Sequence, residues 1–230
     1  MFELSPLESE ALDLSLRVAV WSVLTSLPAG LFVAWLLARR EFPGKTALNG
    51  VVHLPLVLPP VVVGYLLLVL LGRDGPLGRW LLEVFGVSLP FTWQGAALAA
   101  AVMAFPLMVR AMRLSLEAVD RRLEAAARTL GAGPPAVFAT VTLPLMAPGI
   151  LVGALLGFAR SLGEFGATIT FAANIPGQTR TLPLALFGVI QTPGGESDAL
   201  RLAVLSVLLA LVALAASEIA ARRLRARTDG

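Results

Sequence analysis

Long apolar stretches, separated by short polar loops, run along most of the chain. A helix needs about 20 predominantly apolar residues to cross the hydrocarbon core of a bilayer. Five stretches reach that length, and they cover residues 12–38, 51–71, 94–112, 145–162 and 199–221. The fourth of them allows an apolar extension to Phe171. The pattern therefore predicts an all-α membrane protein, a polytopic bundle of about five transmembrane helices that forms one domain over residues 1–230.

A further apolar stretch, residues 181–191, has only about half the length that a crossing requires. We interpret it as a re-entrant segment or a surface helix. The second long stretch contains Pro55, Pro59 and Pro60. Because proline cannot donate the backbone hydrogen bond of a continuous helix, we expect a kink there.

Basic residues gather in alternate loops of this five-helix arrangement. The first loop holds Arg39, Arg40 and Lys45, the third loop and its edges hold Arg110, Arg113, Arg121, Arg122 and Arg128, and the C-terminal tail holds Arg222, Arg223, Arg225 and Arg227. All three segments face one side, and basic loops mark the cytoplasmic side of a membrane protein. We expect a multi-pass protein of the cell (inner) membrane, with its N-terminus outside and its C-terminus in the cytoplasm. A sixth crossing at residues 181–191 would place the basic tail outside.

The composition agrees with a membrane protein and removes several other classes. Of the 230 residues, 57% are hydrophobic and 14% are charged, with a mean hydropathy of +0.82. Soluble domains average about 45–50% apolar and about 25% charged residues. A compact soluble fold, a disordered chain and a nucleic-acid-binding protein are therefore excluded. The chain has no cysteine, which also excludes disulfides, thiolate metal sites and cysteine nucleophiles.

Residues 113–144 form the most informative loop, on the side predicted to be cytoplasmic. Residues 113–130 are rich in Ala, Leu, Arg and Glu, which predicts a helix. Gly131 is a suitable C-terminal stop for that helix, the two prolines at 134–135 suit the start of a second short helix, and Pro144 marks the entry into the fourth crossing. The segment is either a surface helix lying on its own bundle or a docking element for a cytoplasmic partner.

This loop resembles the EAA loop of ABC-importer permeases, in which Glu-Ala-Ala is followed at fixed spacing by glycine, isoleucine and Leu-Pro. Aligned on the glycine, the matching residues are Ala126, Ala127, Gly131, Val141 in the isoleucine position, Leu143 and Pro144. The glutamate position falls on Ala125, with Glu124 one residue earlier. The resemblance implies that the segment from Glu124 to Gly131 docks on an ATPase subunit.

Three further blocks, residues 53–68, 160–187 and 191–197, are similar to the molybdate-importer permease subfamily. The resemblance implies a type I ABC-importer permease architecture and a homodimer. Its implied partners are two cytoplasmic ATP-binding subunits, an extracytoplasmic molybdate-binding protein and the lipid bilayer, with no nucleic acid. The implied function is molybdate import, with tungstate sharing the path. Sulfate is the nearest alternative ion.

We expect a non-catalytic subunit with no bound cofactor, and ATP use by a partner subunit. Gly44-Lys45-Thr46 matches the end of a phosphate-binding loop, but Arg39 occupies the position of the first glycine of that motif. The tripeptide also follows a membrane span rather than a strand, so we interpret it as a chance match. His53 is the only histidine, and one histidine makes no convincing metal site.

Candidate residues for the translocation path or its gate are Pro59, Pro60, Arg160, Glu164 and Gly166. Arg160 and Glu164 lie four residues apart, so a helix places them on one face, where they can pair. Charges inside a membrane are a functional hypothesis by default. The alternative is a purely structural pair, and small residues and prolines equally suit close helix packing.

Two other classes of function are weaker alternatives. A stand-alone secondary transporter or channel would require internal repeats or a relay of intramembrane ionisable groups, and it would leave the loop at residues 113–144 unexplained. A membrane-embedded enzyme is disfavoured because the sequence offers no cysteine and no second histidine for catalysis.

Overall fold

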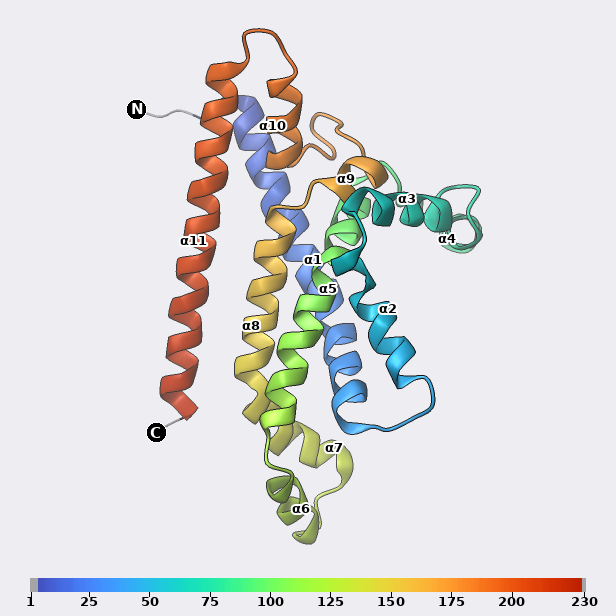
Figure 1. Ribbon diagram of the computed structural model, residues 1–230, viewed down its shortest axis with the longest axis vertical. Helices are drawn as coiled ribbons and strands as arrows, with labels where there is room; N and C mark the ends of the chain where they lie inside the picture. The colour runs from blue at the N-terminus through green and yellow to red at the C-terminus, as the bar shows by residue number, and fades with distance from the viewer. Residues whose placement is uncertain (1–3, 229–230) are drawn as a thin grey trace.

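The computed structural model describes residues 4–228, without the side chains of residues 217, 218 and 220–228. Its helices are α1 (Pro6–Arg39), α2 (Lys45–Val57), α3 (Pro60–Leu71), α4 (Pro76–Phe85), α5 (Trp93–Ala118), α6 (Arg121–Thr129), α7 (Pro134–Val137), the π-helix η1 (Phe138–Thr142), α8 (Leu143–Leu162), α9 (Gly166–Phe171), α10 (Leu182–Ile190) and α11 (Glu196–Thr228). Figure 1 shows an elongated bundle in which α1, α5 and α8 lie side by side and α11 stands next to α8. The all-α prediction is confirmed.

Helix α5 is the central helix of the bundle, and small residues allow its neighbours to approach closely. Its buried positions include Ala96, Ala97, Ala99, Ala100, Ala101 and Ala104. A Cβ atom added at Gly157 of α8 would lie 2.7 Å from the Met108 sulfur of α5, and one at Gly149 would overlap Ser115. Helices in a membrane associate by such close packing, because lipid provides no hydrophobic driving force between them.

The second predicted crossing is one continuous stretch in sequence but two helices in the structure. Helices α2 and α3 meet at an angle of 119°. The break follows from the sequence, because Pro59 and Pro60 both lack a backbone N–H and end the hydrogen-bond ladder at Leu58. Four helices of the described chain are long and apolar enough to span a membrane, and the bent pair of α2 and α3 is the fifth candidate when it is counted as one span. The predicted kink is therefore a full break.

The fourth predicted crossing ends at Leu162, and the proposed extension to Phe171 is a separate short helix, α9. Helix α10 covers the ambiguous apolar stretch with nine residues, about 14 Å of helix, which is too short to cross. Its first residue is fixed to α1, since the backbone N–H of Leu182 donates to Ser15 Oγ at 2.8 Å. This agrees with the interpretation of residues 181–191 as a segment that does not span.

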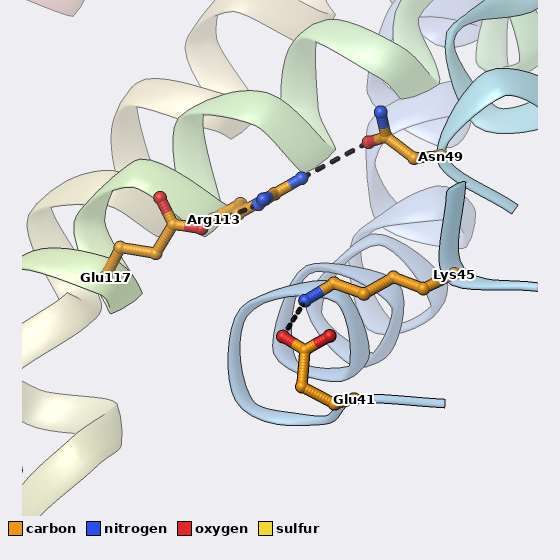
Figure 2. A network of polar contacts seen from close by, with 5 residues as sticks. All are labelled: Glu41, Lys45, Asn49, Arg113 and Glu117. Atoms are coloured by element: carbon orange, nitrogen blue, oxygen red, sulfur yellow. Dashed lines mark hydrogen bonds and ion pairs between the residues drawn. The ribbon is translucent and has the colours of Figure 1, made fainter. Parts of the chain in front are cut away.

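The bundle has two distinct ends. The loop end contains the C-terminus of α1 together with α6 and α7, and the far end contains α9, α10 and the start of α1 (Figure 1). Helix α1 begins at the far end and α11 finishes toward the loop end, which agrees with an odd number of crossings. Near the loop end Arg113 joins α2 to α5, because it donates to Asn49 Oδ1 at 3.2 Å and to Glu117 Oε1 at 2.7 Å (Figure 2).

Helix α11 packs on α8 and α10 but leaves most of its apolar surface exposed. At the far end its Arg201 donates to both carboxylate oxygens of Glu8 on α1, at 2.8 and 2.9 Å. Glu8 is buried and closes a capping box with Ser5. This ion pair fixes the start of the last helix to the start of the first. The side chains of the predicted basic tail, residues 222–227, lie outside the described part.

Candidate coupling loop and translocation site

The predicted helix over residues 113–130 is divided in the structure. Helix α5 ends at Ala118, and α6 begins at Arg121. Asp120 causes the division, because its carboxylate accepts the backbone N–H of Arg122 at 2.9 Å and so caps the new helix. Aspartate favours this N-cap position for that reason. The prediction of one helix was wrong, although Asp120 carried the signal for a second start.

Gly131 ends α6 as the sequence predicted. Its φ of +91° is in the left-handed region that glycine adopts without strain. The N–H of Ala132 reaches back to the carbonyl of Ala127 at 3.1 Å, which closes the helix end in a Schellman-type turn. Pro134 then begins α7, as the two prolines predicted. The loop is thus a pair of short helices with a fixed turn between them.

Glu124 connects α6 to two other elements. Its Oε1 accepts from Arg39 Nη2 of α1 at 3.0 Å and from Thr142 Oγ1 of η1 at 2.8 Å. The side chains of Arg39 and Glu124 are only 10% and 13% exposed. Glu124 therefore acts within the chain as the attachment of α6 to the bundle, and sequence spacing alone carried no signal for these two partners.

The outer surface of the loop carries a small apolar patch among exposed arginines. Ala125 and Ala126 are exposed, Ala127 is partly buried, and Gly131 has open space around the position of its missing Cβ. Leu130 is 89% exposed at the tip. We did not single out Leu130 from the sequence. Its position at the end of the predicted amphipathic helix was the signal that could have identified it. The loop thus offers a small apolar face to another surface.

The remaining motif positions form the junction between the loop and α8. Val141 lies in the π-helix, and Leu143 and Pro144 are the first residues of α8. A π-helix has a hydrogen-bond register one residue wider than an α-helix, and such turns are frequent at functional sites. Helices α7, η1 and α8 thus form one continuous helical path from Pro134 to Leu162.

The second candidate site is the place where the broken second crossing meets the break after α8. A Cβ atom added at Gly166 would lie 2.7 Å from Cβ of Pro60, and one at Gly64 would lie 2.6 Å from the carbonyl oxygen of Ala167. Helices α3 and α9 therefore pack with almost no side chain between them. The structure thus brings together Pro60 and Gly166, while Pro59 next to them is exposed.

Arg160 and Glu164 form an ion pair in this region, with 2.5 Å between Arg160 Nη1 and Glu164 Oε2. The Glu164 side chain is 1% exposed, and Arg160 is 29% exposed. The second carboxylate oxygen, Oε1, accepts the backbone N–H of Ala167 at 2.9 Å. Glu164 therefore holds the first turn of α9 as well as the arginine. The pair lies toward the far end of α8, well separated from the coupling residues.

Within residues 4–228 no group of three or more His, Cys, Asp or Glu side chains is placed to hold a metal ion. His53 Nδ1 lies 2.8 Å from the carbonyl of Asn49 in its own helix. Lys45, the lysine of the chance phosphate-loop match, contacts Glu41 at 2.6 Å (Figure 2).

Similarity to known proteins agrees with this arrangement. The chain is 63% identical over 220 residues to the molybdenum transport system permease protein ModB of Escherichia coli, covering 96% of each protein. It is 58% identical over 219 residues to ModB of Haemophilus influenzae, covering 95% of this chain and 96% of that one. A sulfate transport system permease protein, CysW of Synechococcus elongatus, is 42% identical over 175 residues, which are 76% of this chain and 61% of CysW.

Two solved structures share the fold. A bacterial ABC transporter involved in the import of the polysaccharide alginate matches with a TM-score of 0.76 and 17% identity, over 96% of this chain and 80% of that one. The MetNI methionine ABC transporter in inward-facing form matches with a TM-score of 0.68 and 16% identity, over 94% of each chain. The model of the family described as "binding-protein-dependent transport system inner membrane component" matches residues 26–226. The chain therefore belongs to this family of multi-pass inner-membrane transport components.

Proposed function

We propose that this chain is the permease subunit of an ATP-driven importer that carries molybdate, and tungstate by the same path, into the cytoplasm. The near-full-length similarity to molybdenum permeases is the observation that carries the proposal. Tungstate is included because it has the same charge and tetrahedral shape. Sulfate is the competing ion, since a sulfate permease is also similar to most of this chain.

The proposed assembly contains two copies of this chain, two cytoplasmic ATP-binding subunits and an extracytoplasmic molybdate-binding protein. The exposed face of α6, with Ala125, Ala126 and Leu130, is the surface offered to the ATP-binding subunit. This chain itself holds no cofactor and hydrolyses no ATP in the proposal.

In the proposed orientation the loop end faces the cytoplasm and the far end faces outside. Arg39, Arg40 and the arginines of α6 all lie at the loop end. The positive-inside rule assigns such an end to the cytoplasm. The N-terminus is then outside, and the C-terminal tail is in the cytoplasm.

The proposed transport movement starts at α6 and reaches the bundle through Glu124. A displacement of α6 moves the end of α1 through Arg39 and the start of α8 through Thr142. Packed helices transmit such movements as rigid bodies. At the other end of α8 lie Arg160, Glu164 and the contact of α9 with α3, which we assign to the translocation path or its gate.

Uptake into reconstituted vesicles tests the proposal. The permease is reconstituted with its ATP-binding subunit and binding protein, and uptake of molybdate, tungstate and sulfate is compared with ATP inside. ATP-dependent uptake of molybdate and tungstate over sulfate is expected. Preferred sulfate uptake would identify a sulfate permease. Uptake by the chain alone, or failure to co-purify with an ATP-binding subunit, would instead indicate a stand-alone transporter.

A further inference from the structure

A groove of about 1000 Å³ opens between the last turns of α1 and the loop formed by α6 and α7. We call it the basic groove, because four arginines line it: Arg39, Arg40, Arg121 and Arg128. The one acidic residue in its lining, Glu124, is already bonded to Arg39. The groove therefore carries a net positive charge that no side chain of the described part balances.

Arg39 is a fixed part of the groove wall, because its side chain is nine-tenths buried and its Nη2 donates to Glu124 at 3.0 Å. Arg40 is held beside the groove by its contact with the Trp35 ring, 5.2 Å from guanidinium carbon to ring centroid.

The wall of the basic groove is apolar and long. Leu31, Phe32 and Trp35 of α1 line it, and it extends up the helix as far as Pro28. Pro28 and Arg40 are twelve positions apart along α1 and its C-cap, which corresponds to about 18 Å at 1.5 Å per residue. One leaflet of the hydrocarbon core is about 15 Å thick. The wall thus matches an acyl chain of one leaflet, and the arginines lie at its polar end.

We propose that the basic groove binds an anionic phospholipid, with the phosphate group at Arg40, Arg121 and Arg128 and one acyl chain along Leu31, Phe32 and Trp35. The charge of the groove selects an anion, and basic pockets between helix ends at a membrane surface bind anionic head groups in general. The length and apolar character of the wall select a lipid over a free phosphate or oxyanion, which would leave the wall uncovered.

A lipid bound in the groove would affect how α6 docks on α1. Four elements line it, α1, α6, α7 and η1, and the Arg39–Glu124 pair joins α1 to α6. A phospholipid in the groove contacts Arg121 and Arg128 of α6 and Arg40 of the α1 end at once. The lipid therefore favours the arrangement in which α6 is docked on α1.

Native mass spectrometry of the full-length permease in detergent tests the proposal. The protein is titrated with phosphatidylglycerol and with phosphatidylcholine of the same acyl chains. Wild-type protein should retain phosphatidylglycerol preferentially. The variant Arg40→Gln/Arg121→Gln/Arg128→Gln should lose about fivefold in affinity per arginine, and Phe32→Ala should also weaken retention.

A charge-matched control uses three arginines outside the groove, Arg73→Gln/Arg79→Gln/Arg122→Gln. It should retain phosphatidylglycerol like wild type, and melting in detergent verifies that all variants are folded. Equal loss in both triple variants, or equal retention of the two lipids by wild type, would overturn the proposal. A competition experiment with glycerol phosphate separates a lipid from a soluble anion. If glycerol phosphate displaces the lipid at equal concentration, the groove is a site for soluble anions and the proposal is overturned. Occupation by a second copy of the chain would appear as a dimer that excludes the lipid, and this too would overturn it.

Discussion

The carboxylate of Glu124 accepts a hydrogen bond from the guanidinium of Arg39 at 3.0 Å, across 85 residues of sequence. This contact attaches the short helix α6 to the last turn of α1. Thr142 donates to the same carboxylate oxygen, so one side chain joins three elements at the loop end. The loop is therefore attached to the rest of the bundle at two points, Arg39 and Thr142.

The first prediction concerns this attachment. Glu124→Ala leaves the nearly buried Arg39 without its carboxylate and Thr142 without its acceptor. We expect the local stability of the loop to fall by about 2 kcal/mol, because buried polar groups are left unpaired. Limited digestion with trypsin, which cleaves after arginine, reports this directly, since Arg121, Arg122 and Arg128 of α6 are exposed. Cleavage there should become at least about tenfold faster.

The matched control for this prediction is Glu117→Ala. Glu117 also pairs with an arginine near the loop end, Arg113, but both side chains are substantially exposed. An exposed pair of this kind contributes about 0–1 kcal/mol. Cleavage within α6 should therefore change little. Equal acceleration in both variants would show that Glu124 has no special place in holding the loop.

The second prediction separates docking from folding at Gly131. The position has open space where a Cβ would be, but its φ is +91°, so Gly131→Asp costs about 1–2 kcal/mol of backbone strain. The new carboxylate projects from the surface proposed to meet the ATP-binding subunit. We expect an inserted, folded permease in which ATP hydrolysis continues but oxyanion uptake is lost. Hydrolysis and uptake are measured in the same reconstituted vesicles.

Gly86→Asp is the matched control for Gly131→Asp. Gly86 also follows a helix, has a φ of +66° and has open space around the missing Cβ, but it lies at the end of α4, away from α6. Gly86→Asp should leave coupling intact. If Gly131→Asp transports normally, or if Gly86→Asp uncouples equally, the docking role of Gly131 is contradicted.

Much of this architecture was readable from local sequence signals. The length of the apolar stretches predicted the crossings, and Gly131 and Pro134 predicted the end of one short helix and the start of the next. These features depend on backbone chemistry within a few residues. The start of α6 is also a local feature, because the Asp120 side chain caps it through the backbone N–H of Arg122. The sequence contained this N-cap signal, although we did not predict a helix start there.

Other features depend on contacts between distant segments. Pro59 and Pro60 predicted a kink, but the 119° angle is set by the packing of α3 on α9, where Gly64 meets Ala167. The partners of Glu124 are likewise fixed by tertiary packing. A single sequence contains no periodicity or spacing that relates residues 85 positions apart. The residues of the candidate site could therefore be predicted from the sequence, but the tertiary contacts between them could not.

The third prediction tests the two roles of Glu164. Its Oε1 caps α9 through the Ala167 N–H, and Oε2 pairs with Arg160. Glu164→Gln keeps an oxygen for the cap, whereas Glu164→Ala removes it and should cost about 1–2 kcal/mol more in stability. The double variant Arg160→Ala/Glu164→Gln removes both charges. We expect it to remain folded but to lose most of its oxyanion uptake.

Melting in detergent and vesicle uptake check these outcomes on the same preparations. A double variant that transports like wild type would reduce the pair to a structural contact. Melting of Glu164→Gln as low as that of Glu164→Ala would show that the charge, rather than the cap, stabilises α9.

The last prediction concerns the contact between α3 and α9. Gly166→Ala places a Cβ atom 2.7 Å from Cβ of Pro60 and 3.2 Å from the backbone nitrogen of Val61. Neither neighbour is a flexible side chain, so the two helices must separate, at a cost of about 1–3 kcal/mol. A lower melting temperature, by about 2–4 °C per kcal/mol, is expected together with reduced uptake.

Gly163→Ala, three residues earlier, is the matched control. A Cβ atom at Gly163 would have no atom within 4 Å, and the residue has an ordinary φ of −92°. The substitution should leave both quantities unchanged, and equal damage from the two substitutions would contradict a specific role for the α3–α9 contact.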